Sequence, residues 1–388
     1  MLRVESITLR EIRLPLVQPF RSAGGMVTER RMLLLTLTDT DGTIAWSECV
    51  AEALPSYSSD TVDTCWLAIS EWVAPRVLGR EFASPADVHP ALTTEIRGHH
   101  MAIAAVEMGM WALAAMQAGQ PLASHLVRHS FAAGGDAEPR PDVKTGIAIG
   151  IQADADATAF RARSAVEQGY RSIRMKIEPG SDLQHVRAAR DAAGRDVRLV
   201  ADANGSYSLD DPAHAAALRS LDEAGLDLIE QPLGPDELVR HSELQRAFAT
   251  PICLDESITS PSLARDMIAL GSARALNLKP GRVGGIVQAI AIHDICARSG
   301  IRMWCGGMLE SGIGRAFNVA LASLPAFTDP GDLSPSARYW ERDIVAPEWK
   351  MDSQARVRVP LDRPGIGVDV DVDFVDALTS RVVVLRAS

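Results

Sequence analysis

The feature that most constrains this chain is a series of six short apolar segments between residues 170 and 314, each followed by charged or polar residues and a turn. Stretches of helical length separate the segments, which are SIRMKIEPG (172–180), LVADANG (199–205), LIEQPL (228–233), ICLDES (252–257), LNLKPGRVGG (276–285) and MWCGGMLESGIG (303–314). The first five segments each supply one candidate residue, and these candidates follow one another at 26, 28, 25 and 24 positions: Lys176, Asp202, Glu230, Asp255 and Lys279. Because parallel strands need a crossover of a dozen or more residues, this period predicts a closed parallel barrel with an outer ring of helices.

The charged residues stand at the carboxyl ends of the predicted strands, where barrels of this kind carry their chemistry. Side chains two positions apart in a strand face the same way, so three pairs should point inward together: Arg174 with Lys176, Asp202 with Asn204, and Asn277 with Lys279. One site could then hold three acids, Asp202, Glu230 and Asp255, between two lysines. Taken singly, such residues are usually solvated or capping groups, but five in register at strand ends indicate a shared site.

The chain is longer than one barrel needs. Its 388 residues exceed the roughly 200 to 250 of a barrel, so a second, smaller domain is expected. We predict a capping domain over 1–127, a linker over 128–142, a barrel over 143–335 whose first strand is 143–151, and a C-terminal segment over 336–388 that returns to the first domain.

The first 127 residues read as strands followed by helices. Residues 1–50 alternate like an antiparallel meander, and residues 60–127 are helical in pattern. His99 and His100 are adjacent at the start of the strongest helix, so we expect a helix-start or surface pair rather than ligands.

Between the first two strands, residues 18–26 contain Gly24-Gly25 and small polar residues. This composition favours a mobile lid that could bring Phe20 and Ser22 to a buried site. An ordinary hairpin connection explains the same residues equally well.

Composition narrows the class of partner. A net charge of −11 and a pI near 5.3 argue against nucleic acid and anionic membranes, both of which favour a basic surface, so a small molecule is the expected partner. Five cysteines without a CxxC pair suggest neither a disulfide framework nor a zinc site. The amino terminus lacks the pattern of an export signal, and no apolar run approaches the roughly 18 residues of a membrane span. We therefore expect a cytoplasmic protein.

Three inward carboxylates repel one another unless a cation lies among them. Oxygen ligands without His or Cys point to Mg²⁺ or Mn²⁺ rather than zinc, and such an ion could stabilise the negative charge of an enolate formed from a substrate carboxylate. A lysine acts as a base only when neutral, so we expect burial and nearby positive charge, from the metal, Arg174 or Arg282, to lower the pKa of the lysines.

Other residues are candidates for contacts around these charged groups. Glu256 should point away from Asp255 because the two are adjacent, so its role is taken as supporting or structural. Glu310 and Ser311, in a glycine-rich loop, could line the pocket or simply form the turn. Each of the further candidates is expected either to touch the substrate or to support a residue that does. They are Arg174, Asn204, Glu256, Arg282, Gly307, Met308, Glu310, Phe20, Ser22 and Tyr57.

These motifs resemble those of the enolase superfamily, and within it the muconate-lactonizing subgroup, over nearly the whole chain. The resemblance implies a (β/α)7β barrel with an α+β capping domain built from the N-terminal region and the C-terminal tail. It implies that Lys176, the second lysine of a Lys-x-Lys motif, and Lys279 are the acid/base pair. It also implies that one divalent ion is held by Asp202, Glu230 and Asp255, and that the protein is a homo-oligomer, such as a dimer or an octamer.

One departure from the family pattern is that Arg174 replaces the first lysine of Lys-x-Lys, which keeps the positive charge. A mandelate-type relative would have a histidine where this chain has Gly306-Gly307, and a dipeptide epimerase an Asp-x-Asp that is absent here. The segments KIEPG, IEQPL, PICLDES, NLKPGRVGG and WCGGMLESGIGRA are most similar to the N-acylamino acid racemases that also carry o-succinylbenzoate synthase activity.

The resemblance implies racemisation of an N-acylated, and specifically an N-succinylated, amino acid through a metal-stabilised enolate. The alternative is o-succinylbenzoate synthase, a dehydration that starts from the same kind of enolate; one enzyme could perform both. A third alternative, a binding barrel without turnover, is disfavoured because both lysines and all three acids are present.

Overall fold

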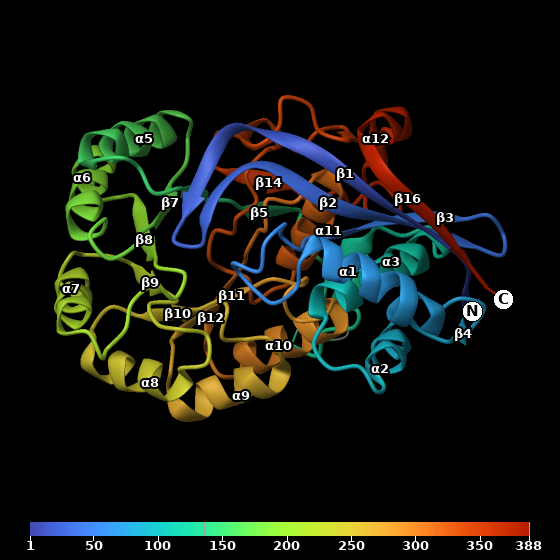
Figure 1. The fold of residues 1–388 in the computed structure, drawn as a ribbon, viewed down its shortest axis with the longest axis horizontal. Helices are drawn as coiled ribbons and strands as arrows, with labels where there is room; N and C mark the ends of the chain where they lie inside the picture. The colour runs from blue at the N-terminus through green and yellow to red at the C-terminus, as the bar shows by residue number, and fades with distance from the viewer. Residues whose placement is uncertain (133, 135–136, 388) are drawn as a thin grey trace.

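The computed structural model describes residues 1–132, 134 and 137–387, and it joins a curved parallel sheet, ringed by helices, to an antiparallel sheet with its own helices (Figure 1). The antiparallel sheet has the strand order β16-β1-β2-β3, with β4 (Glu81–Phe82) paired to β1. Its main strands are β1 (Leu2–Ser22), β2 (Gly25–Asp39), β3 (Ile44–Cys49) and β16 (Thr379–Arg386). The N-terminal meander is thus confirmed, and the C-terminal strand pairs with the first strand of the chain.

One long helix carries the core of this capping domain. Helix α3 (His100–Gln117) is apolar on nearly all sides and buried from Met101 to Ala115, as expected for a helix enclosed by other elements. Gly109 allows it to approach the sheet closely, because a Cβ there would lie 2.5 Å from a methyl carbon of Leu37. The smaller elements around it are α1 (Val62–Ala68), a π-helical turn (Ile69–Val73), 3₁₀ turns (Ala74–Arg76 and Pro85–Asp87), α2 (Val88–Thr93) and α4 (Leu122–Val127).

The parallel sheet contains seven strands in the order β12-β11-β10-β9-β8-β7-β6. They are β6 (Ile147–Ile149), β7 (Ser172–Lys176), β8 (Arg198–Asp202), β9 (Leu228–Glu230), β10 (Ile252–Leu254), β11 (Ala275–Leu278) and β12 (Arg302–Cys305). The intervening helices are α5 (Ala155–Glu167), α6 (Leu183–Ala193), α7 (Pro212–Asp222), α8 (Leu238–Ala247), α9 (Pro261–Leu270) and α10 (Ile286–Arg298), and α11 (Gly312–Ala322) follows β12. The predicted alternation of strands and helices is confirmed.

The gap between β12 and β6 is closed by an extended segment rather than by a regular strand. Gly146 N–H donates to the carbonyl of Gly331 (2.8 Å), and Asp332 N–H donates to the carbonyl of Cys305 (3.0 Å). Residues 327–332 therefore take the place of the eighth strand and complete the predicted (β/α)7β barrel.

The prediction of one continuous strand over 143–151 is wrong. The chain forms two short strands there, β5 (Asp142–Lys144), which pairs with β14 (Arg356–Arg358), and β6 in the barrel. The pairing partner changes at Gly146, where a Cβ would lie 3.0 Å from the carbonyl oxygen of Ser172. An apolar run alone does not reveal such a change of partner.

The C-terminal part returns from the barrel to the capping domain. Its elements are a 3₁₀ turn (Ser336–Arg338), β13 (Val345–Ala346), β14, β15 (Asp369–Val370), α12 (Val372–Leu378) and β16. Among the helices of the described residues, none has the length and apolar character needed to cross a membrane.

Candidate active site

A small cavity of about 80 Å³ lies at the carboxyl ends of the barrel strands, under the tip of the β1–β2 hairpin. Both domains contribute to its wall. The lining residues are Phe20, Ser22, Gly24, Val27, Glu52, Ser56, Tyr57, Ala148, Arg174, Lys176, Asn204, Glu256, Lys279, Gly307, Met308, Leu309, Asp332 and Tyr339.

The three predicted acids meet in one cluster. Lys176, Asp202 and Glu230 are register partners at the ends of adjacent strands β7, β8 and β9, and Asp255 follows the end of β10. All three carboxylates are fully buried. Parallel pairing in register thus places side chains that are 26 and 28 positions apart in the sequence side by side, as the sequence pattern predicted.

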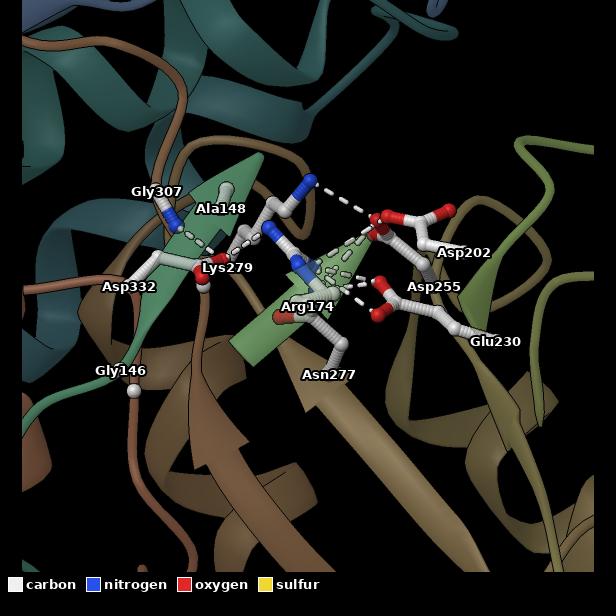
Figure 2. Close-up of polar contacts among 12 residues, drawn as sticks. Gly146, Ala148, Arg174, Asp202, Glu230, Asp255, Asn277, Lys279, Gly307 and Asp332 are labelled. Carbon is white, nitrogen blue, oxygen red and sulfur yellow. Dashed lines mark hydrogen bonds and ion pairs between the residues drawn. The ribbon is translucent and has the colours of Figure 1, made fainter. Parts of the chain in front are cut away.

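Arg174 lies between the three acids on one side and Asp332 on the other (Figure 2). Its Nη1 donates to both oxygens of Glu230 (2.8 and 3.0 Å) and lies 3.5 Å from Asp202 Oδ2. Its Nη2 pairs with Asp332. The guanidinium therefore bridges carboxylates on two sides, which a lysine ammonium cannot do with the same planar geometry.

The two lysines each bind a different acid. Lys176 Nζ donates to Asp202 Oδ2 (2.6 Å) and to Asn204 Oδ1 (2.9 Å). Lys279 Nζ donates to Asp255 Oδ2 (2.8 Å). Strands β8, β9 and β10 separate β7, which ends at Lys176, from β11, which ends just before Lys279, so the two ammonium groups reach the cavity from different sides of the acidic cluster.

Tyr57 connects the capping domain to the Lys279 side of the site. Its hydroxyl donates to Asp255 Oδ1 (2.8 Å) and accepts a bond from Arg282 Nη1 (3.1 Å), and the Lys279 ammonium lies 4.4 Å from the centre of its ring. Arg282 also pairs directly with Asp255 but does not line the cavity. It fixes Asp255 from behind.

The donor set suits a hard divalent cation, since three carboxylates from successive strands offer only oxygen ligands. If all groups are ionised, six acids (Asp202, Glu230, Asp255, Glu256, Asp332 and, in the cavity wall, Glu52) face four cations (Arg174, Lys176, Lys279 and Arg282). Glu256 Oε2 and Asn277 Oδ1 are buried without a hydrogen-bond partner among the described residues. The acidic groups around the cavity therefore outnumber the basic groups.

The acids are nevertheless not grouped around one point. Among the described residues, no three His, Cys, Asp or Glu side chains form a group that could hold a metal ion as they stand. The oxygens of Glu230 are instead engaged by nearby donors, since Arg174 Nη1 donates to both of them and Asn277 Nδ2 donates to Oε1 (2.7 Å).

Burial and mutual repulsion set the acidity of the cluster. Burial, with the neighbouring Asp202 and Asp255, raises the pKa of Glu230 to about 8 against the opposing effect of Arg174. Burial and the Asp255 charge similarly raise the pKa of Glu256 to about 7. Burial opposes ionisation of Asp255 as well, but Lys279 and Arg282 outweigh it and lower its pKa.

Burial, Arg174 and Arg282 do not by themselves lower the pKa of Lys279, contrary to that part of the expectation. Burial is the largest single effect and disfavours the ammonium form, as do Arg282 and Arg174, but the nearby acids, with Asp255 first and Glu256 second, together raise the pKa of Lys279. Among the neighbouring charges, Asp255 has a larger effect than the guanidinium groups because its carboxylate accepts a hydrogen bond from Lys279 Nζ (2.8 Å).

The structure corrects the expectation for Glu256 and selects between the two alternatives for Glu310 and Ser311. Glu256 does not point away from the site: it lines the cavity and accepts a bond from Asn204 Nδ2 (2.8 Å). Strand β10 ends at Leu254, so strand alternation no longer applies there. Glu310 and Ser311 do not line the cavity, because Glu310 pairs with Arg315 (2.8 Å) and Ser311 caps α11. Gly307 and Met308 from the same loop do line it.

Most of the segment 18–26 is strand, because β1 runs to Ser22 and β2 begins at Gly25. The hairpin interpretation therefore describes it better than a loose loop. Phe20 pairs with Val27 and Ser22 with Gly25, and both Phe20 and Ser22 reach the cavity. The tip is attached to the barrel, since Arg21 pairs with Glu178 (2.6 Å) and its carbonyl accepts a bond from Ile151 N–H (2.8 Å).

Asp332 is a site residue that the sequence reasoning missed. It lines the cavity, pairs with Arg174 and accepts a bond from Gly307 N–H (3.4 Å). The sequence feature that could have revealed Asp332 is the regular spacing of strand ends, because Asp332 follows Cys305, the last residue of β12, by 27 positions. The lack of an apolar strand pattern around it concealed this.

Comparison with known proteins agrees with this architecture. Residues 5–126 match the family Mandelate racemase / muconate lactonizing enzyme, N-terminal domain, and residues 157–374 match the family Enolase C-terminal domain-like. A solved enolase superfamily member from Listeria innocua is 34% identical, covers 100% of both chains and has a TM-score of 0.91. Fold and site thus define a capped-barrel enzyme, and the chain belongs to the enolase superfamily.

Within the superfamily, the similar proteins carry two names. An o-succinylbenzoate synthase of Geobacillus kaustophilus is 42% identical over 378 residues, which cover 97% of this chain and 96% of that protein. An N-succinylamino acid racemase of an Amycolatopsis species is 42% identical over 384 residues, which cover 98% of this chain and 99% of that protein.

Proposed function

We propose that this protein racemises N-acylamino acids, with N-succinylamino acids as the substrate class. The observation that supports this most directly is that two primary amines, Lys176 and Lys279, line one cavity from different sides of a carboxylate cluster. Racemisation by proton transfer needs a base on one face of the α-carbon and an acid on the other.

In this proposal one lysine removes the α-proton and the other returns a proton to the opposite face. Lys176 is held between Asp202 and Asn204, and Lys279 between Asp255 and the Tyr57 ring. These contacts fix both Nζ atoms, so that little motion is needed to reach the α-carbon. Because a lysine must be neutral to accept a proton, Lys279 works as a base only when the charge of Asp255 is engaged elsewhere.

A Mg²⁺ or Mn²⁺ ion held by Asp202, Glu230 and Asp255 would supply that engagement and would stabilise negative charge developing on the substrate carboxylate. Arg174, which bridges Glu230 and Asp332, keeps a fixed positive charge beside the same cluster. The hairpin tip covers the site and limits access of water, which strengthens each of these electrostatic interactions.

A second candidate is o-succinylbenzoate synthase, and a specific observation favours it. Lys279 is held as a cation by Asp255 and by the face of Tyr57, an arrangement suited to a fixed positive charge rather than to a base. The elimination would then need only Lys176 as base. Relatives of both names are equally similar to this chain.

The two candidates are tested by assaying N-succinylamino acids of each hand beside the synthase substrate, with Mg²⁺ and with a chelator. Racemisation requires both amines, so Lys176→Ala and Lys279→Ala should each abolish it. Elimination that survives in Lys279→Ala would favour the synthase. An unmodified protein that turns over neither substrate in the presence of Mg²⁺ would contradict both candidates.

A further inference from the structure

Two glutamates of the capping domain are buried against the barrel and have no part in the chemistry proposed above. Glu107, in α3, is fully buried, and Glu48, in β3, is 1% exposed. In the described part of the chain, no lysine, arginine or histidine side chain donates a hydrogen bond to either carboxylate. Buried carboxylates are costly unless they are hydrogen-bonded, so their partners reveal why they are there.

Glu107 binds the start of a barrel helix. Its Oε2 accepts a bond from Ile286 N–H (2.7 Å), and its Oε1 accepts bonds from Val287 N–H (2.9 Å) and from Trp111 Nε1 (2.7 Å). Ile286 and Val287 are the first two residues of α10, whose N-cap, Gly285, provides no side-chain cap. A carboxylate from the other domain therefore satisfies amides that a helix leaves free at its start, where the helix dipole also favours negative charge.

Glu48 makes the corresponding contact with the next helix. It accepts bonds from Ser311 N–H (3.2 Å), Ser311 Oγ (2.6 Å) and Gly314 N–H (3.0 Å) at the start of α11. The two glutamates thus attach the capping domain to two consecutive barrel helices.

The helix that Glu107 binds begins directly after the loop that carries Lys279. Only Pro280 to Gly285 separate Lys279 from α10, and the loop is closed by Gly285 N–H donating to Pro280 O (2.9 Å). The capping domain also presses on this loop, because a Cβ on Gly281 would lie 2.5 Å from Val50 Cγ2 and one on Gly285 would lie 2.3 Å from Glu107 Oε2. Gly285 has a φ of +119°, which favours glycine as well.

We propose that Glu107 is a positioning residue for Lys279: by holding the first turn of α10, it sets the loop from Pro280 to Gly285 and hence the place of the Lys279 amine. Lys176 lies at the end of β7, and among the described residues no residue of the loop that follows it shares a hydrogen bond with Glu107, whose partners are Ile286, Val287 and Trp111. The effect of Glu107 on the two amines is therefore unequal. This inference rests on the proposed function, in which each amine faces one side of the α-carbon.

The test is the exchange of the substrate α-proton with solvent deuterium, measured separately for each hand of an N-succinylamino acid. Lys279→Ala identifies the hand whose α-proton faces Lys279, as the hand that no longer exchanges. Glu107→Gln keeps the shape of the side chain but places an NH₂ group against amide donors. For the Lys279 hand, Glu107→Gln should slow exchange by about tenfold or more, the effect of one lost hydrogen bond to a charged group. For the Lys176 hand, we expect a loss of under about threefold, less than one ordinary hydrogen bond.

Two matched variants complete the design. Glu48→Gln removes an equally buried contact between capping domain and barrel that does not touch the Lys279 loop, so it should affect both hands alike. Glu5→Gln neutralises an exposed glutamate on β1 and should change nothing. If Glu107→Gln fails to fold, Glu107→Asp replaces it, since it keeps the charge but withdraws it from the amides.

Equal losses in both hands for Glu107→Gln, no loss in either, or the same asymmetry for Glu48→Gln would each overturn the inference. These outcomes differ from failure of the proposed function, in which the unmodified protein shows no exchange with either hand.

Discussion

At the scale of single residues, Arg174 is the clearest departure from what the enolase superfamily resemblance implies. A lysine at this place could donate to Glu230 or to Asp332, whereas the guanidinium reaches both at once. Arg174 and its partners are almost completely buried, so this bridge links the middle of the barrel to the segment that closes it.

Arg174→Lys should therefore destabilise the protein although it conserves charge. A single ammonium loses at least one charge-assisted bond and leaves a buried carboxylate unpaired, so we expect the free energy of unfolding to fall by about 1 to 3 kcal/mol. Urea unfolding checks this, with Arg163→Lys on the exposed face of α5 as the control. Equal midpoints for the two variants would show that the bridge contributes nothing beyond its charge.

At the scale of elements, the tip of the β1–β2 hairpin forms part of the wall of the site. A cavity of about 80 Å³ is smaller than the roughly 300 Å³ or more of ordinary small-molecule sites, so we expect the tip or the side chains beneath it to move when a substrate binds. The ion pair of Arg21 with Glu178 is one contact that holds the tip closed.

Arg21→Ala should weaken substrate binding more than it slows turnover. Because the pair is partly exposed, it contributes up to about 1 kcal/mol, which corresponds to about a fivefold rise in KM. The effect should shrink in high salt, where exposed ion pairs are screened. Arg13→Ala, which removes an ion pair with Glu29 on the same hairpin, is the control; an equal rise in KM for both variants, or none for either, would contradict a role for the tip.

The two helix-capping glutamates also make stability depend on pH. Burial raises the pKa of Glu107 to about 7, and burial with the nearby Glu310 charge raises that of Glu48 to about 7, both from 4.5. Between pH 4.5 and about pH 7 the folded protein binds more protons than the unfolded chain. The free energy of unfolding therefore falls as the pH rises through this range. Each group accounts for up to about 3 kcal/mol of this loss.

The difference in unfolding free energy between the unmodified protein and Glu107→Gln should consequently decrease from pH 5 to pH 8, because the glutamine does not titrate. Chemical unfolding at four pH values measures it. A difference that stays constant or grows with pH would show that Glu107 is ionised throughout and that its amide partners outweigh burial.

At the scale of the whole molecule, much of the architecture could be predicted because it follows from local periodicity. The spacings between the charged residues from Lys176 to Lys279 indicate strand-plus-helix units, and the register of the parallel strands then brings Asp202 and Glu230 together. Asp332 was not predicted because its segment makes backbone hydrogen bonds to its neighbours without showing an apolar strand pattern in the sequence. Glu107 escaped because nothing local relates it to Ile286, 179 positions away.

Mg²⁺ should stabilise the whole molecule if the acids hold it. A ligand that binds only the folded state raises the free energy of unfolding by about 2.7 kcal/mol at a hundred times its Kd. The thermal midpoint should therefore rise with MgCl₂ but not with KCl of equal ionic strength, and Asp202→Asn should reduce the rise. Equal midpoints in the two salts would remove the support for a metal at this site.

The central claim is that two amines serve opposite faces of one α-carbon. Hand-resolved exchange of the α-proton in deuterated solvent tests it most directly, using Lys176→Ala and Lys279→Ala beside the unmodified protein. We predict that the unmodified protein exchanges both hands, that each variant exchanges only one, and that the two variants retain opposite hands. If either variant exchanges both hands, or if both variants retain the same hand, the two-amine account is contradicted.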